Sequence, residues 1–352
     1  MISILPTGGA VQETLYRKYL KNLDISGNSE KLKIFEDIFS EFELRWSENE
    51  NLAEICRYSF FNPGKMLRPF LLVESARIVG GDVNKIIKPA VGVESAHIAS
   101  LMHDDIIDND DIRRGKPSSH VIYGQNDTIV AADALIFDLF ATLAECAKLG
   151  IPSNRVVRSV ELAAEAGKFL CEGQVLEGRI KKDHNYAFNT YLQMIEWKTA
   201  VLFKTVCEVG GILGGGNPEI CNKLGSYGLN LGIAFQMVDD LLPYISETSI
   251  EGKNLYSDIL NNRPTLPIII AYMYSSKHTR KRIEGALYGK DDIEIRARYL
   301  NQVVDTTNAV KIGKKIALGY VKNAKQSLLG ILADSDSHIF NLCLERVIER
   351  CR

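Results

Sequence analysis

The stretch VGVESAHIASLMHDDIIDNDDIRRG, residues 91–115, decides the fold class, because an apolar helical run leads directly into a concentration of acidic residues. Five aspartates fall within the eight positions 104–111, and two arginines follow them at once. Asp104 and Asp108 are four residues apart, so on a helix both carboxylates leave the same face, with Asp105 beside them. This pattern predicts a buried helix whose carboxyl end carries a cluster of negative charge.

Helical spacing recurs along the whole chain of 352 residues. Between Arg155 and Glu177 small and apolar side chains repeat every three or four positions and predict one helix. Sustained two-residue alternation is missing, and no Asn-Gly or Asp-Gly turn separates apolar runs. We therefore predict an all-α fold of ten or more helices. The face of the 155–177 helix that we expect to be buried consists of Val160, Ala164, Gly167, Cys171 and Gln174.

The composition is typical of a globular protein, with 46% hydrophobic and 24% charged residues, which excludes disordered and fibrous classes. No long linker divides the chain, so we predict a single domain over residues 11–352 behind a flexible tail of residues 1–10. A formal net charge of −2 provides no basic field for nucleic acid, and we expect no such partner.

The seven cysteines show neither the spacing of a zinc site nor a disulfide framework, which favours a reducing compartment. No apolar run approaches the roughly 20 residues that a membrane helix needs. We therefore expect a cytoplasmic protein without a membrane span.

The clustered aspartates require a compensating cation. Like charges at this helical spacing repel by roughly 0.2–0.5 kcal/mol per pair in water, and by more in a low-dielectric cleft. Oxygen ligands without cysteine favour a hard ion, and Mg²⁺ suits carboxylates that leave room for water and phosphate oxygens. A second pair, Asp239 and Asp240, lies at the carboxyl side of the apolar run GIAFQMVDDLLPY, residues 232–244. We expect the two pairs to face one another across a bundle and to hold metal between them.

Two other interpretations of the acidic residues stay open. A solvated acidic helix end accounts for one such motif but does not explain two. A di-iron carboxylate bundle needs Glu-x-x-His pairs on facing helices, and we expect none here. Phosphate chemistry with Mg²⁺ remains the better explanation.

Basic residues lie where they can complete a phosphate site. The segment NPGKMLRP, residues 62–69, has the pattern of a loop that enters a helix, and such a helix start offers backbone N–H groups and cations to a phosphate. Each of these cations taken alone is typical of a solvated surface. A lone histidine on an apolar helix, such as His97, is more often a core residue than a ligand. The candidates are Gly64, Lys65, Arg68, Arg113, Arg114, Lys198 and Lys253.

These motifs, in this order, resemble the trans-isoprenyl diphosphate synthases, all-helical enzymes that make geranyl, farnesyl, geranylgeranyl and longer polyprenyl diphosphates. NPGKMLRP is similar to the family's GGKRLRP loop, and HDDIID with RRGKP to its first aspartate-rich motif. CEGQVLE is similar to the GQxxD segment, with Glu177 in the acidic place, and WKTA and FQMVDD follow in the family's order. NNRPTLP is similar to the end of the family's GKxxGxDLxxGKxTLP tail, with Arg263 in a lysine's place. The resemblance extends from about Asn62 to Pro267.

The resemblance implies a helical bundle around a central cavity, a homodimer, and the Mg²⁺-dependent head-to-tail condensation of isopentenyl diphosphate with an allylic diphosphate. It implies that three Mg²⁺ ions bind, with Asp239 holding the third. The catalytic residues that it implies are Asp104, Asp105, Asp108, Lys198, Asp239 and Asp240, of which the metal ligands are Asp104, Asp105, Asp108 and Asp239. It implies that isopentenyl diphosphate contacts Gly64, Lys65, Arg68, His97 and Arg114. It implies that the allylic diphosphate contacts Arg113, Lys198, Thr199, Gln236 and Lys253.

The chain departs from the family at Pro243, which stands at the fifth position of a motif that is usually DDxxD. Proline offers no metal ligand, and inside a helix it removes a backbone donor and kinks the chain at a cost of roughly 3 kcal/mol. We expect the third Mg²⁺ to be held less tightly and the activity to survive. The rival hypothesis is a non-catalytic partner subunit that modulates an active prenyl synthase.

Product length is predicted from the residues one turn before Asp104. Ala99 and Ser100 are both small, whereas the resemblance implies that bulky aromatics at these positions stop the growing chain at fifteen carbons or fewer. We therefore predict geranylgeranyl diphosphate as the main product, with longer polyprenyl diphosphates as the alternative. Phe137 or Phe140, on the next helix, is the candidate for a deeper floor of the cavity.

Overall fold

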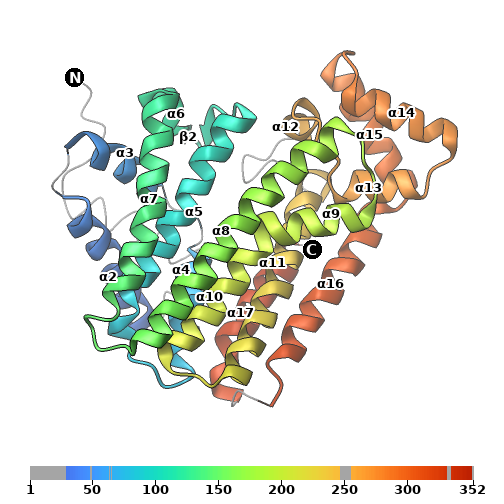
Figure 1. Ribbon diagram of the computed structural model, residues 1–352. Coiled ribbons are helices and arrows are strands. Elements are labelled where there is room, and N and C mark those ends of the chain that lie inside the picture. The colour runs from blue at the N-terminus through green and yellow to red at the C-terminus, as the bar shows by residue number, and fades with distance from the viewer. Residues whose placement is uncertain are drawn as a thin grey trace. The chain divides into compact units, whose positions relative to one another are not determined.

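The computed structural model describes residues 29–47, 50–62, 64, 66–245, 255–330 and 334–350 (Figure 1). Nearly all of its regular structure is helical, so the prediction of an all-α fold with ten or more helices is confirmed. The chain divides into two compact units, Met1–Val73 with Gly81–Val160, and Glu74–Gly80 with Glu161–Arg352. The predicted tail, residues 1–10, lies outside the described residues, and the single domain over 11–352 stays a prediction.

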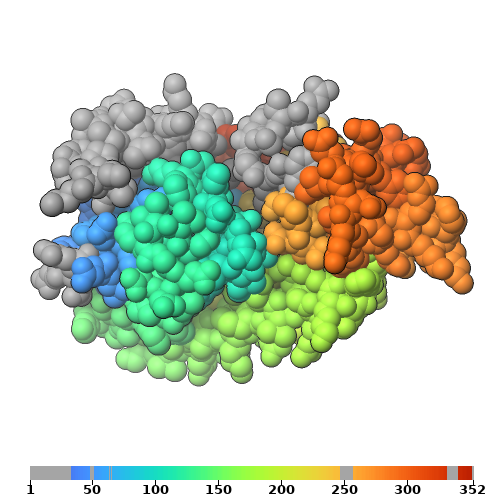
Figure 2. Space-filling view, turned by 90° about the horizontal axis from the view of Figure 1, so that it is seen from above, coloured from blue at the N-terminus to red at the C-terminus, as the bar shows by residue number. Residues whose placement is uncertain are grey.

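The first unit is built around α5 (Ile87–Asp108), which packs along α7 (Gln125–Glu145). Its helices α3 (Glu50–Phe60) and α6 (Ser119–Tyr123) both pack on α7, and their blue and blue-green surfaces adjoin in Figure 2. Aromatic side chains fill the core beneath α2 (Ser29–Arg45), where the rings of Phe42 and Phe60 stack with centroids 3.6 Å apart. α4 (Leu67–Arg77) carries the chain out of this unit. The acidic end of α5 is thereby fixed by packing along the whole helix.

The second unit is built around α11 (Pro218–Ile245), which packs along both α10 (Val201–Gly214) and α16 (Ala309–Ser327). A single π-helical turn, η2 (Glu196–Ala200), follows α9 (Phe188–Ile195) and packs on α11. π-turns often occur at functional sites. The unit also contains residues 161–182 of α8 (Ser153–Lys182), together with α12 (Leu255–Leu260), α13 (Leu266–Met273), α14 (Lys277–Tyr288), α15 (Ile293–Thr306) and α17 (Asp334–Glu349).

The helix predicted between Arg155 and Glu177 is present as part of α8, but its predicted buried face is wrong. Ala164, Gly167 and Cys171 are exposed, while Leu162 and Ala166 are buried. Alanine and glycine lie on both faces of this helix, so spacing alone could not distinguish two registers that differ by a few residues. The observed register is the one that buries the larger side chain of Leu162.

Every helix in the described part of the chain is too short or too polar to cross a bilayer.

Candidate active site

The first acidic motif lies at the carboxyl end of α5, which ends in a left-handed cap at Asn109. Asp105 and Asp108 are buried, with 4% and 7% of their surface exposed, and Asp104 is half-buried. Arg113 donates from Nε to Asp105 Oδ1 at 2.8 Å, and its Nη2 contacts the same oxygen. Burial raises the pKa of Asp105, and the hydrogen bond from Arg113 partly offsets this. Asp105 is therefore engaged by a cation of the protein itself, whereas Asp104 and Asp108 share the face expected to bind metal.

Arg113 and Arg114 belong to a small β-hairpin that the sequence analysis did not predict. Strands β1 (Ile112–Arg113) and β2 (Lys116–Pro117) pair antiparallel, with Arg113 opposite Lys116. The connecting residues Arg114 and Gly115 both have positive φ, 53° and 76°, as a two-residue type I′ turn requires. The turn has neither Asn-Gly nor Asp-Gly, because an arginine occupies its strained first position, and each strand has only two residues.

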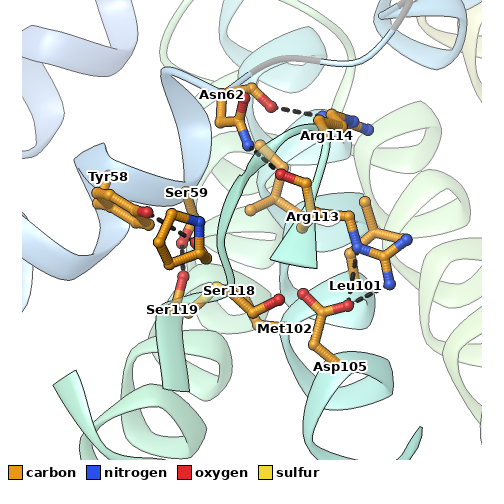
Figure 3. Close-up of a pocket in the computed structure, with 12 residues that line it drawn as sticks. Tyr58, Ser59, Asn62, Leu101, Met102, Asp105, Arg113, Arg114, Ser118 and Ser119 are labelled. Atoms are coloured by element: carbon orange, nitrogen blue, oxygen red, sulfur yellow. Dashed lines mark hydrogen bonds and ion pairs between the residues drawn. The ribbon is translucent and has the colours of Figure 1, made fainter. Parts of the chain in front are cut away.

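Hydrogen bonds to the end of α3 hold the hairpin in place, and Figure 3 shows them converging around a small pocket. Tyr58 donates to the Pro117 carbonyl at 2.7 Å, and Asn62 Nδ2 donates to the Arg113 carbonyl at 3.0 Å. The pocket holds about 30 Å³ of free space, enough for one or two water molecules but not for a prenyl substrate. The pocket lies between the hairpin and α3 and is too small to be a substrate cavity.

The predicted isopentenyl diphosphate residues lie close together in the first unit. Arg114 Nη1 donates to the Asn62 carbonyl at 2.6 Å, and a side chain at Gly64 would have to displace the same guanidinium. Arg68 Nη1 lies 3.2 Å from His97 Nε2. An arginine can only donate, so this histidine nitrogen accepts. Burial and then the nearby arginines hold the pKa of His97 well below its usual 6.5, so the ring is neutral at neutral pH. Lys65 lies outside the described residues.

A buried acid that the sequence analysis missed lies among these cations. Glu94 is 1% exposed, and among the described residues neither of its carboxylate oxygens has a hydrogen-bond partner. Burial raises its pKa, while the charges of Arg114 and Arg68 act in the opposite direction. The expectation of no Glu-x-x-His pair was wrong, because Glu94 and His97 form one. A di-iron site needs a second pair, and His97 Nε2 faces a guanidinium, so this pair does not support iron binding.

In the second unit the two aspartates of the second motif have different partners. Asp240 accepts from Tyr191 Oη at 2.8 Å, from Gln236 Nε2 at 2.8 Å and from the Leu266 backbone N–H at 3.1 Å. These bonds link α11 to α9 and to the start of α13, so Asp240 holds helices together. Asp239 accepts instead from Arg350 Nη2 at 2.9 Å.

The predicted allylic diphosphate residues of the second unit are connected by hydrogen bonds. Thr199 Oγ1 donates to Gln236 Oε1 at 3.0 Å, and Gln236 is the residue that donates to Asp240. Lys198 lies on the π-turn, where a Cβ at Gly173 would collide with its backbone, so the glycine of CEGQVLE permits close contact with α8. Lys253 lies outside the described residues.

The carboxylate of Glu177 forms ion pairs with the cations Lys198 and Arg263. This carboxylate is buried, with Lys198 Nζ at 2.6 Å from Oε2 and Arg263 Nε at 3.1 Å from Oε1. Burial opposes the charged form, but Lys198, Arg263 and then Lys181 outweigh it and lower the pKa of Glu177 from 4.5 to about 2. Glu177 therefore stays ionised and orients Lys198.

The predicted chain-length residues occupy different environments. Ala99 is fully buried, and Ser100 is half-buried and donates to the His97 carbonyl of its own helix at 2.7 Å. Phe137 is 72% exposed, on the side of α7 opposite the buried residues Leu135 and Leu139. This exposure argues against Phe137 as the floor of a cavity within one chain. Phe140 is half-buried.

Comparison with known proteins agrees with the motifs. The sequence profile of the family described as polyprenyl synthetase matches residues 49–303, which is most of the chain. The chain belongs to the polyprenyl synthetase family. The predicted resemblance to trans-isoprenyl diphosphate synthases is thus confirmed. The protein is a prenyltransferase, a trans-prenyl diphosphate synthase that acts on isoprenoid diphosphates.

Individual members of the polyprenyl synthetase family are similar over most of the chain. A geranylgeranyl diphosphate synthase of Saccharolobus solfataricus is 36% identical over 245 residues, 70% of this chain and 74% of its own. A geranylfarnesyl diphosphate synthase of Aeropyrum pernix is 31% identical over 293 residues, 82% of this chain and 91% of its own. The crystal structure of geranylgeranyl pyrophosphate synthetase from Pyrococcus horikoshii matches with a TM-score of 0.84 at 31% identity, over 96% of this chain and 99% of that one.

Proposed function

We propose that this prenyl synthase catalyses the Mg²⁺-dependent head-to-tail (1′-4) condensation of isopentenyl diphosphate with an allylic diphosphate, and that geranylgeranyl diphosphate is its main product. The observation that carries the proposal is the end of α5, where Asp104 and Asp108 share a face and Arg113 and Arg114 follow on a fixed hairpin. Negative charge for a metal and positive charge for diphosphates are thus supplied by one segment.

The first motif suits Mg²⁺. In the described part of the chain no three His, Cys, Asp or Glu side chains converge as a closed metal cage. Mg²⁺ does not need one, because it is commonly bound by one or two carboxylates and completed by water and substrate phosphate oxygens. Asp104 and Asp108 would supply these carboxylates, while Asp105 is held by Arg113. When bound, the ion would stabilise negative charge on a departing diphosphate.

The chain's own residues then serve each stage of the reaction. Breaking the C1–O bond of the allylic diphosphate leaves a carbocation and a diphosphate, and we assign Arg113, Lys198 and Thr199 to the departing oxygens. C4 of isopentenyl diphosphate attacks the cation, and the departed diphosphate accepts the proton that is lost from C2. Glu177 keeps Lys198 in place, with its Nζ at 2.6 Å. No side-chain nucleophile is required.

We assign isopentenyl diphosphate to the cations of the first unit. Arg68 and Arg114 would bind its phosphates, and neutral His97 orients Arg68 by accepting from it. Glu94 lies among these arginines, and burial raises the pKa of its carboxyl while the charges of Arg114 and Arg68 oppose that rise. Lys65 is assigned to the same group from its motif.

The product-length proposal depends on Ala99 and Ser100, and a purified-protein assay tests both activity and length. With isopentenyl and geranyl diphosphates we expect a product that dephosphorylates to geranylgeraniol, because the two small residues leave room beyond fifteen carbons. Ser100→Phe should shift the dominant product to farnesol, while Ser153→Phe, at the start of α8, should not. A farnesol peak from the native protein would contradict the open-cavity proposal, and longer alcohols would favour the polyprenyl alternative.

The non-catalytic partner subunit remains the second candidate function, favoured by Pro243 alone. The same assay separates the two. The subunit hypothesis predicts no turnover by the purified protein alone and turnover when an active prenyl synthase is added.

We propose further that the protein is a homodimer, and its location in the cytoplasm stays a prediction. The exposed face of α7 supports the dimer, since Ile129, Val130 and Phe137 are 40%, 59% and 72% exposed. Such a row is typical of an interface. Phe137→Glu is expected to convert a dimer into a monomer in analytical ultracentrifugation, with Lys148→Glu as the control. A native protein that sediments as a monomer would refute the dimer.

A further inference from the structure

The carboxyl end of α17 places Arg350 against the second acidic motif. Arg350 Nη2 donates to Asp239 Oδ1 at 2.9 Å, and each side chain is only 14% exposed. The two residues are 111 positions apart in the sequence, so tertiary packing creates the pair. An ion pair with so little exposure to solvent is expected to be stronger than an exposed ion pair on the surface.

Packing of α17 on α11 fixes this position. Tyr227, buried in α11, donates to the Phe340 carbonyl at 2.8 Å, and the two rings meet edge to face at 5.0 Å. Arg350 also lies with its guanidinium carbon 5.2 Å from the centroid of Phe235, one turn before Asp239 on α11. The arginine thus contacts an aromatic face and a carboxylate on the same helix, and both contacts favour a cation there.

The rest of the second motif leaves Asp239 as its one carboxylate for a cation. Asp240 accepts three hydrogen bonds, of which those from Tyr191 and from the Leu266 backbone join helices. Pro243, one turn after Asp239, offers no carboxylate, and it has no N–H with which to close the helical hydrogen bond to the Asp239 carbonyl. The helix nevertheless continues to Ile245. A divalent ion that binds here must therefore compete with Arg350 for a single side chain.

We infer that Arg350 is the resident cation of the second acidic motif: it competes with a divalent ion for Asp239 and supplies positive charge at this position without a metal. An arginine is suited to this, because its guanidinium stays charged and is more weakly hydrated than an ammonium group. That the charge acts toward a diphosphate rests on the proposed function. The competition for Asp239 does not.

Metal binding measured without turnover tests the inference. Free Mn²⁺ is titrated by electron paramagnetic resonance in the presence of inorganic pyrophosphate, for the native protein and for Arg350→Ala. We expect the variant to bind its weakest Mn²⁺ about tenfold more tightly, which corresponds to about 1.4 kcal/mol. The matched control is Arg346→Ala, because Arg346 lies one turn earlier on α17 and is 3.4 Å from exposed Glu349. Equal Mn²⁺ binding by Arg350→Ala and the native protein would overturn the inference.

A second pair of variants guards against misfolding. Arg350→Gln keeps most of the side-chain volume and should behave like Arg350→Ala, whereas Arg350→Lys should stay close to the native protein. Pro243→Asp should also tighten the weakest ion, since it adds a carboxylate one turn from Asp239. Thermal unfolding of each variant checks the fold. If the native protein makes no prenyl diphosphate but the Mn²⁺ shift is observed, the proposed function fails and the inference stands.

Discussion

The two aspartate pairs have similar sequences and different environments. At the end of α5 one aspartate, Asp105, is paired with an arginine, and two others share a face. On α11, Asp240 accepts one hydrogen bond from its own helix and two from α9 and the start of α13, and Asp239 accepts one from Arg350. We infer from this difference that a carboxylate's role follows from its partners: the first motif would bind metal, whereas the second joins helices through Asp240 and pairs with Arg350 through Asp239.

The largest difference between the motifs is expected in catalysis. Asp104→Asn removes a proposed metal ligand and should lower kcat by about 10²–10³, the usual effect of losing a transition-state charge stabiliser. Asp239→Asn should lower it by about tenfold or less, because Arg350 remains near the site. Steady-state turnover of labelled isopentenyl diphosphate measures both. Equal losses would remove the distinction between the two motifs.

The second prediction concerns the stability that the buried carboxylate of Glu177 provides in the second unit. Glu177→Gln should lower the free energy of unfolding by about 3 kcal/mol, because Lys198 and Arg263 lose their buried counter-charge. The pKa of Glu177 is lowered from 4.5 to about 2, so its contribution is complete above about pH 4.5 and is lost as the pH falls toward 2. Urea unfolding between pH 7 and pH 2 tests this. Glu172→Gln, at an exposed position of the same helix, is the control, and a pH-independent difference between native protein and Glu177→Gln would contradict the assignment.

The smallest expected effect concerns Asp240. If it joins helices, Asp240→Asn should destabilise the protein by about 1–3 kcal/mol, the cost of leaving buried donors unpaired. Tyr191→Phe, which removes one of the three donors, should cost about 1 kcal/mol. Denaturant midpoints measure both changes. Native stability for Asp240→Asn together with a changed Mg²⁺ dependence would instead make Asp240 a metal ligand.

Much of the fold and of the candidate site could be predicted from sequence, because both depend on local pattern. Helical spacing gave the all-α class, and the order of short motifs gave the family. Arg68 and His97 do lie together, as do Thr199 and Gln236. The prediction that the two acidic pairs face one another stays a prediction.

Other features were not readable from local pattern. Arg350 reaches Asp239 across 111 positions, and no spacing rule connects them. In the sequence Glu94 has the pattern of an ordinary helix residue, whereas in the structure it is buried near two arginines. The hairpin at Arg114 depends on a positive φ that arginine rarely adopts. In each case tertiary packing outweighs what the residue type alone would favour.

The most direct test of the difference between the motifs is a crystal structure grown with Mn²⁺ and a non-hydrolysable allylic diphosphate analogue, with the ions located by anomalous scattering. We expect Mn²⁺ bound to Asp104 and Asp108, and Asp240 still bound to Tyr191 and the Leu266 backbone. Mn²⁺ coordinated by Asp239 and Asp240, with none at Asp104 or Asp108, would contradict this expectation.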